Sequence, residues 1–219
     1  MSQVQILSGA PVDVAELVDA PGLGSGGVTR GGSSPLSDTM KIIDNFLSEE
    51  DYEKLNTVIV KSDFEWGKST ILTGGRFQPH KIFNIQFVHK FAKVHTKSID
   101  DVLVDHWLKK SKHYNIIEPI LEKINYSTII RIKANLTVGM LNPQPSGYHI
   151  DVGEGNNVRP GFTGIYYVNT CNGYTLFEDG TKVQSVANRI VIFDNQLKHS
   201  GVSCSDNRYR IVINFNWLP

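Results

Sequence analysis

The chain of 219 residues is 40% apolar and 20% charged, which is ordinary for one globular domain with a full hydrophobic core. Its 22 basic and 22 acidic residues give a formal net charge of zero, which argues against a dedicated nucleic-acid binder with a basic stripe. No apolar run approaches the roughly 20 residues that span a bilayer, and the chain does not open with a signal-peptide pattern. The two cysteines cannot build a disulfide framework or a CxxC zinc site, so a reducing, cytoplasmic location is expected.

Residues 1–39 differ in character from the rest of the chain. The stretch GLGSGGVTRGGSSPLSDT (22–39) is rich in Gly and Ser and has no strand or helix period, so residues 1–39 are predicted to be a flexible tail. The words AELVDAPGLGSGG and GGSSPL resemble the translation of a leucine transfer-RNA gene, which implies that the tail is not native coding sequence and that the domain, residues 40–219, starts at Met40. A genuine flexible tail is the alternative. A cloverleaf fold-back upstream of the Met40 codon distinguishes the two.

From Met40 the pattern becomes orderly. KIIDNF (41–46) predicts a short strand, and Ser48 predicts the start of a helix, since Asp51 three residues on completes a weak capping box. Loose alternation over 64–91 predicts strands with a hairpin at the Gly74-Gly75 break. A second helical region is predicted over 99–124, as two helices of which the second starts near Pro119. Its apolar residues recur at intervals of three and four: Val102, Leu103, Trp107, Leu108, Ile116, Ile117, Ile120, Leu121 and Ile124.

After Tyr126 the apolar period changes to two. Four segments alternate in this way between turn residues, and each predicts a strand. These segments are 127–139, 161–170, 188–194 and 208–217. A helical N-terminal part followed by many short antiparallel strands predicts an α+β fold in which the strands form a sandwich or jelly roll.

His149 and Asp151 lie two residues apart, so in an extended segment both side chains project to the same face. His-x-Asp is short enough to arise by chance, and an exposed polar pair is the alternative reading. His199 follows an apolar strand and a turn, and distant strands become neighbours in a jelly roll. Two histidines and one carboxylate on one face of an octahedral ion form the facial triad of non-haem Fe(II) oxygenases.

The last predicted strand supplies a possible anchor for 2-oxoglutarate, the cosubstrate of many such oxygenases. Arg208 and Arg210 share a face by strand parity with Val212, Asn214 and Asn216. An Arg on the inner face of a narrow barrel is costly unless it meets an anion, and its planar fork suits a carboxylate.

Several segments, in order, resemble the Fe(II)/2-oxoglutarate-dependent dioxygenases of prolyl 4-hydroxylase type. They are HID (149–151), TGIYYVN (163–169), GYTLFEDG (173–180), NRIVIF (188–193) and HSGVSCSDNRYRIVINFNW (199–217). The resemblance covers residues 40–217 and implies a double-stranded β-helix with N-terminal supporting helices. It also implies His149, Asp151 and His199 as Fe(II) ligands and Tyr167 as a hydroxyl donor to the 2-oxoglutarate C5 carboxylate. The spacing of nine residues from the distal His favours Arg208 as the anchor. The Arg directly before the apolar strand favours Arg210, as in phage and bacterial relatives, and Arg210 is preferred.

The activity implied by this resemblance is hydroxylation of an unactivated C–H, with O₂ consumed and succinate and CO₂ released. A prolyl or other peptide side chain is the expected substrate and a small molecule stays open, as does the oligomeric state; ascorbate is a further candidate cofactor. Asp151 favours hydroxylation, because halogenating relatives lack that carboxylate. Alternatives are a nucleic-acid demethylase of the same fold, against which the neutral charge counts, a cupin-type jelly roll and a non-catalytic binding module. The loop VGMLNPQPSGY (138–148) departs from the family and leaves the substrate undetermined.

Overall fold

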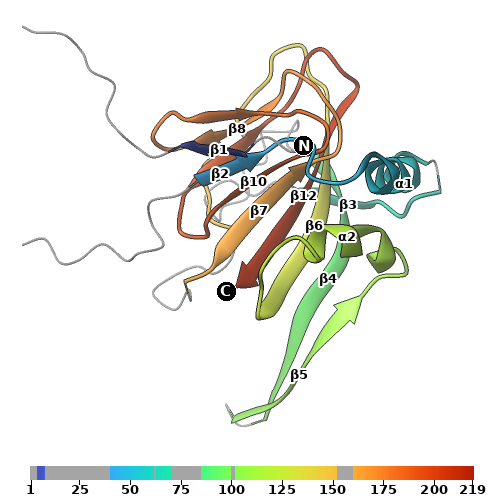
Figure 1. The fold of residues 1–219 in the computed structure, drawn as a ribbon, viewed down its shortest axis with the longest axis vertical. Helices are drawn as coiled ribbons and strands as arrows, with labels where there is room; N and C mark the ends of the chain where they lie inside the picture. The colour runs from blue at the N-terminus through green and yellow to red at the C-terminus, as the bar shows by residue number, and fades with distance from the viewer. Residues whose placement is uncertain (1–3, 8–39, 62, 71–84, 100–101, 152–159) are drawn as a thin grey trace, which may run out of the picture.

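The computed structural model describes residues 4–7, 40–61, 63–70, 85–99, 102–151 and 160–219. Two antiparallel sheets make up most of this part of the chain (Figure 1). The large sheet has the order β1-β2-β10-β7-β12-β6-β4-β3, with β5 also paired to β4. Its strands are β1 (Val4–Leu7), β2 (Met40–Ile43), β3 (Gly67–Thr70), β4 (Ile85–Ile99), β5 (Val102–Lys110), β6 (Thr128–Val138), β7 (Phe162–Tyr167), β10 (Arg189–Asp194) and β12 (Tyr209–Leu218).

The small sheet has the order β11-β8-β9 and lies against one face of the large sheet. Its strands are β8 (Tyr174–Phe177), β9 (Lys182–Gln184) and β11 (His199–Val202). Helices are few: α1 (Glu49–Val60), a 3-10 turn over Tyr114–Ile117 and α2 (Glu118–Leu121). The predicted α+β architecture of antiparallel strands with supporting helices is therefore confirmed. None of the described helices is long and apolar enough to cross a membrane.

Strand β12 shows how the sequence separates the two faces of the large sheet. Its odd-numbered residues, from Ile211 to Trp217, are buried in a core shared with Leu55 and Ile59 of α1. Val212 instead belongs to a second core, between the two sheets, with Tyr167. Adjacent residues of a strand project to opposite faces, so the polar even-numbered positions of β12 face the space between the sheets. That space contains the candidate site.

Helix α1 begins as the sequence predicts. The backbone N–H of Asp51 donates to the Ser48 hydroxyl over 3.2 Å, and the first turn is acidic. Leu55 and Ile59, four residues apart, are buried against the large sheet. The prediction of a helix starting at Ser48 is therefore confirmed, and this helix covers the face of the sheet that lies away from the site.

The prediction of a helix over the first half of 99–124 is wrong. Strands β4 and β5 form an antiparallel hairpin in that region, with Ala92 opposite Lys110 and Ile99 opposite Val102. Figure 1 shows this hairpin extending beyond the rest of the sheet. Apolar spacing over so short a window does not separate a helix from a strand, and pairing with β4 decides the outcome. The second predicted helix is present as α2, with Pro119 in its first turn.

Other sequence predictions for the N-terminal half have mixed outcomes. The strand predicted at KIIDNF is β2; within 64–91, β3 is present and β4 begins, although β4 continues to Ile99. The expected Gly74-Gly75 turn lies outside the described residues. In the segment expected to be a flexible tail, Val4–Leu7 forms β1 and pairs with β2. The rest of 1–39 is not described, and its origin stays a prediction.

Candidate metal centre

His149 and His199 face each other across an isolated antiparallel bridge. The backbone N–H of each residue donates to the carbonyl oxygen of the other over 3.0 Å. His199 is the first residue of β11, and His149 lies on the segment that leads to Asp151. The bridge fixes the two imidazoles side by side, with their ring centroids 4.8 Å apart. Strand pairing thus brings together residues that are fifty positions apart in the chain.

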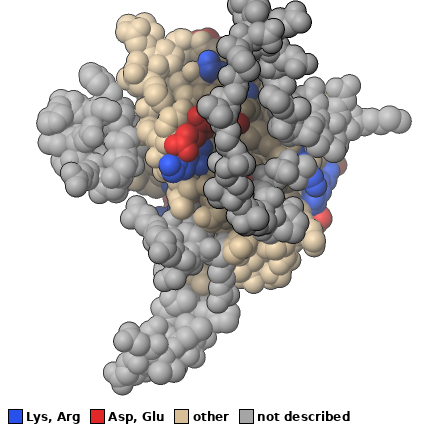
Figure 2. Space-filling view, turned by 90° about the vertical axis from the view of Figure 1, so that its left-hand side faces the viewer, with Lys and Arg blue, Asp and Glu red and all other residues tan. Residues whose placement is uncertain are grey.

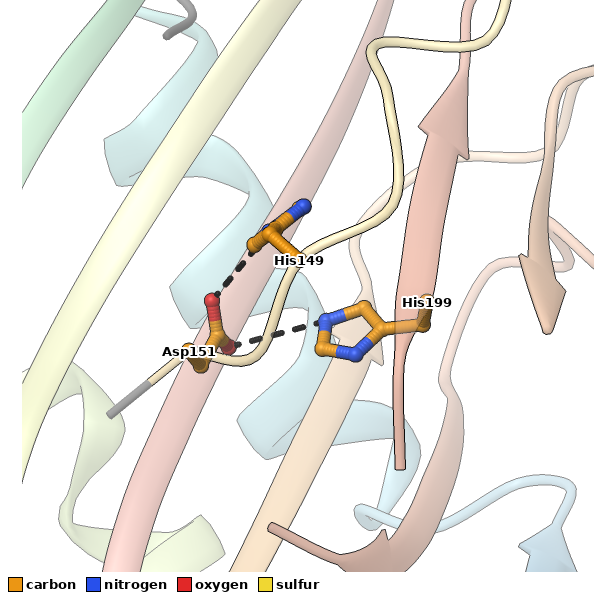
Figure 3. A group of neighbouring side chains, drawn as sticks. All are labelled: His149, Asp151 and His199. Carbon is orange, nitrogen blue, oxygen red and sulfur yellow. Dashed lines mark ion pairs between the residues drawn. The ribbon is translucent and has the colours of Figure 1, made fainter. Parts of the chain in front are cut away.

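The carboxylate of Asp151 completes this group (Figure 3). Its Oδ1 lies 3.6 Å from His149 Nε2, and its Oδ2 lies 3.9 Å from His199 Nε2. One ligand atom from each of the three residues lies within 4.8 Å of the others. The structure therefore brings together all three residues that the sequence predicts as metal ligands.

Hydrogen bonds orient both imidazoles toward the carboxylate. Nδ1 of His149 bonds to the carbonyl oxygen of Gly147 over 3.1 Å, and Nδ1 of His199 bonds to that of Leu197 over 3.0 Å. A carbonyl can only accept, so each Nδ1 carries the proton and each Nε2 has a free lone pair. The buried Nε2 of His199 has no hydrogen-bond partner among the described residues. Such an orphaned acceptor beside a carboxylate and a second imidazole fits a divalent transition metal.

Three side chains hold Asp151, whose own side chain is only 5% exposed. Asn214 Nδ2 donates to Oδ2 over 2.9 Å, and Asn216 Nδ2 approaches the same oxygen at 3.5 Å. Arg131 Nη2 lies 3.2 Å from Oδ1, and its Nε donates to Asn216 Oδ1. Partners of this kind fix the orientation of a ligating carboxylate.

The electrostatics keep Asp151 ionised and His199 neutral, as a metal requires, but they favour the protonated form of His149. Burial by itself raises the pKa of Asp151, but the His149 hydrogen bond and the charges of His199 and Arg131 outweigh it, so the net pKa lies far below the usual range. Burial lowers the pKa of His199, which stays neutral at pH 7. Burial also opposes protonation of His149, but its contact with Asp151 prevails and raises its pKa. Ligation would require that proton to leave.

Arg210 is buried at the other end of the space between the sheets, with 4% of its surface exposed. Its Nε donates to the Ser185 hydroxyl over 2.7 Å, and its Nη2 donates to that of Thr175 over 3.2 Å. Its guanidinium lies 5.5 Å from the centre of the Tyr167 ring. No described Asp or Glu forms an ion pair with it, and burial lowers its pKa. A buried cation in such surroundings suits an anionic ligand.

The other two residues predicted to bind the cosubstrate differ in placement. Tyr167 is fully buried, and its hydroxyl donates to Thr175 Oγ1 over 2.8 Å, beside the Arg210 guanidinium. Arg208 is exposed just before β12, where its carbonyl accepts from the Gly139 N–H. Of the two candidate arginines, the structure places only Arg210 between the sheets.

Gly201 lies against the Arg210 guanidinium. A Cβ at this glycine would lie 3.5 Å from Arg210 Nη1. Gly201 follows His199 by two residues, so the two share a face of β11 at a separation of about 7 Å along the strand. The buried guanidinium and the imidazole therefore lie along one face at a separation that a five-carbon dicarboxylate can bridge.

A second group of metal-capable side chains, Cys171, Cys204 and Asp206, lies near Arg210. Burial raises the pKa of the Cys204 thiol to about 11, so it stays protonated at neutral pH. Both carboxylate oxygens of Asp206 accept from the backbone N–H of Asn172 over 2.9 Å. Metals bind thiolates, so this group is a weaker candidate than the triad.

Sequence reasoning did not assign a role to Arg131, Asn214 or Asn216. The signal was present in β12, where polar residues alternate with apolar ones on a buried strand. Their contact with Asp151 depends on the pairing of β6 with β12, which places Arg131 opposite Asn216.

No protein-family model matches the sequence, and no curated protein matches it either. Solved structures do resemble the fold. An oxidoreductase of the 2OG-Fe(II) oxygenase family from Burkholderia pseudomallei superposes with a TM-score of 0.56 at 10% identity, over 81% of this chain and 84% of that one. A prolyl hydroxylase from Trichoplax adhaerens, in complex with a hypoxia-inducible-factor peptide fragment, gives a TM-score of 0.52 at 12% identity, over 81% and 83%.

A viral collagen prolyl hydroxylase from Paramecium bursaria Chlorella virus-1, in truncated form, gives a TM-score of 0.50 at 13% identity, over 88% of this chain and 97% of that one. At sequence identities this low, structural similarity shows that the folds are alike. The expected jelly roll is confirmed: the chain has the fold of the 2-oxoglutarate- and Fe(II)-dependent oxygenase structures.

Proposed function

We propose that this protein is an Fe(II)- and 2-oxoglutarate-dependent dioxygenase that hydroxylates an unactivated C–H bond. The observation that carries the proposal is the pair of sites on one strand face. His199, in contact with His149 and Asp151, lies two residues from the point where buried Arg210 meets β11. A metal at one end and, at the other, a cation with no carboxylate partner among the described residues match the two ends of 2-oxoglutarate.

His149, Asp151 and His199 would hold the Fe(II). When bound, Fe(II) supplies the coupling of O₂ reduction to oxidative decarboxylation of 2-oxoglutarate, which gives succinate, CO₂ and a hydroxylated product. The protein orients the carboxylate of Asp151 through Asn214 and Asn216, and it keeps His199 neutral by burial. Because a carboxylate is present in the triad, hydroxylation is favoured over halogenation.

Arg210 would bind the C5 carboxylate, and Tyr167 would share it through its hydroxyl. Both side chains are buried, so this carboxylate would lie away from water, where a charge-assisted hydrogen bond is strongest. Ser185 and Thr175 already fix the guanidinium plane. The anchor is thus organised before the cosubstrate arrives.

A peptide side chain, prolyl or another, is the proposed substrate. Apolar side chains are exposed on the segment that leads to His149: Val138, Leu141 and Tyr148, of which Leu141 is 96% exposed. Exposed apolar side chains on the segment that leads to the candidate metal centre suit contact with a peptide. Nucleic acid is not favoured, since the formal net charge is zero and Figure 2 shows acidic and basic side chains close together on the described part of the face that it draws.

Succinate release tests the proposal. Purified protein with Fe(II), 2-oxoglutarate, O₂ and ascorbate is expected to release succinate slowly without substrate, and His199→Ala is expected to abolish this turnover. Arg210→Met should raise the KM for 2-oxoglutarate about 100-fold, because a bond to a buried charge is lost. Arg208→Met is the matched control and should leave the KM unchanged. Wild-type protein that binds neither Fe(II) nor 2-oxoglutarate would overturn the proposal and favour a non-catalytic module.

A further inference from the structure

A row of side chains crosses the large sheet beside the candidate metal centre. The strand registers place Lys133 of β6 directly opposite Lys90 of β4 on one side and opposite Asn214 of β12 on the other. Directly opposed residues of an antiparallel pair project to the same face. Asn214 donates to the metal-site carboxylate of Asp151, so this face is the one between the sheets. Lys133 therefore lies on the β4 side of the metal centre.

Lys133 differs from the neighbouring Arg131 in its partners. Arg131 pairs with Asp151 and Asn216, whereas no described residue accepts a hydrogen bond from the Lys133 ammonium or forms an ion pair with it. Lys133 is partly buried, and this burial lowers its pKa, with the charges of Arg131 and Lys90 acting in the same direction and the charge of Asp151 opposing them. A partly buried ammonium beside two other cations is unfavourable by itself and is stabilised by an anion.

The carboxylates of the proposed cosubstrate, 2-oxoglutarate, are not that anion. In the proposed complex, the metal and Arg210 match the two carboxylates of 2-oxoglutarate, and Arg131 already pairs with Asp151. Lys90, opposite Lys133, is exposed and likewise has no acidic partner among the described residues. Two lysines thus line the β4 side of the site, and Asp151, the described acidic group whose charge acts on Lys133, already pairs with Arg131.

We propose that Lys133, assisted by Lys90, binds a carboxylate of the primary substrate next to the carbon that is oxidised. The inference rests on the proposed function and gives its substrate class: an amino acid or peptide whose reacting carbon lies close to a carboxylate. Lys133 then acts as a specificity-determining residue, because a compact ammonium can donate to a single carboxylate oxygen without the geometry that an Arg fork demands. Lys90, nearer to solvent, would draw the anion toward the site.

Direct binding tests this inference without turnover. Protein loaded with Mn(II) and 2-oxoglutarate is titrated calorimetrically with N-acetyl amino acids, including those of Asp and Glu, and with their uncharged carboxamides. At least one carboxylate is expected to bind about tenfold or more tightly than its amide. Lys133→Met should remove this preference, and Lys133→Arg should retain part of it, because the charge is kept.

Lys68→Met is the matched control. Lys68 lies exposed on β3 opposite Phe87, whose register partner Leu136 belongs to the alternate face of β6. The control makes the same change in net charge and should keep the full preference. A carboxylate preference that persists in Lys133→Met would overturn the inference, as would equal binding of acids and amides by wild-type protein or binding of inorganic phosphate alone.

The affinity of the Mn(II)-loaded protein for 2-oxoglutarate shows whether Lys133 binds a carboxylate of the primary substrate or one of the cosubstrate. Lys133→Met is expected to change it less than about twofold. A loss of tenfold or more would assign Lys133 to the cosubstrate and overturn the inference. If wild-type protein binds neither Mn(II) nor 2-oxoglutarate, the proposed function itself fails, and that result is distinct from normal binding without a carboxylate preference.

Discussion

Asn214 and Asp151 lie 63 positions apart in the chain, and the amide of Asn214 donates to the Asp151 carboxylate over 2.9 Å. This bond leaves Asp151 with one oxygen directed at each of the two histidines. We expect Asn214→Leu, which keeps the volume but removes the donor, to weaken Mn(II) binding about 10- to 100-fold. Calorimetric titration with Mn(II) measures this loss of affinity. The exposed Asn207 supplies the control, Asn207→Leu, which should bind the metal as wild-type protein does.

Asn188 joins the start of β10 to the segment before α1. It is buried with a positive φ of 59°, its Oδ1 accepts from the Leu47 N–H and the Tyr166 hydroxyl, and its Nδ2 donates to the Leu47 carbonyl. Asn188→Ala should lower the free energy of unfolding by about 3 kcal/mol, since it loses these bonds and strains the backbone. Asn188→Gly loses only the bonds and should be less destabilised by about 1 kcal/mol. Urea unfolding measures both; equal losses would contradict a contribution from φ.

The ion pair of Asp44 with Arg189 predicts a pH dependence of stability. The Arg189 hydrogen bond, more than its charge, lowers the pKa of Asp44, and the aspartate is about one-third exposed. A carboxyl with a depressed folded-state pKa stabilises the protein above its unfolded value near 3.9, and this contribution is lost as the pH falls through the folded value. The free energy of unfolding of wild-type protein should exceed that of Asp44→Asn by about 0.5–1 kcal/mol at pH 7. The difference in unfolding free energy should shrink below about pH 4; a constant difference would argue against the ion pair.

The two cysteines should react slowly in the native protein. Burial, with a further contribution from nearby Cys171, raises the pKa of Cys204 to about 11, and both thiols are buried. The thiolate is the reactive form, so native protein at pH 8 is expected to react with an aromatic disulfide reagent at least about 100-fold more slowly than protein in urea. Absorbance of the released thiol follows the reaction. Rapid reaction of either cysteine in the native state would contradict the burial.

The sequence predicted those parts of the fold and site in which local pattern and tertiary packing agree. In β12 the alternation of Ile and Phe with polar residues reports the two buried faces directly, and the arginine at position 210 falls on the inner one. The proximity of His149 to His199 followed from strand parity and the jelly-roll expectation. Their role as metal ligands stays a prediction.

Other parts depended on pairings that no local pattern reveals. Residues 102–110 carry apolar spacing compatible with a helix, yet they form the edge strand β5 because β4 is available as a partner. Likewise, the sequence shows Lys133 only as one of several polar residues on a strand that alternates polar and apolar residues. Only its register against Lys90 and Asn214 sets it beside the metal centre.

Strand β1 has a consequence for association between molecules. It pairs with the outer side of β2, whose other side pairs with β10. A chain that starts at Met40 would lack β1, and β2 would then present unpaired backbone donors and acceptors, with the exposed Lys41 as a charge that discourages a second molecule from adding a strand there. The position of the start codon therefore decides whether this margin of the large sheet is covered or open to intermolecular pairing.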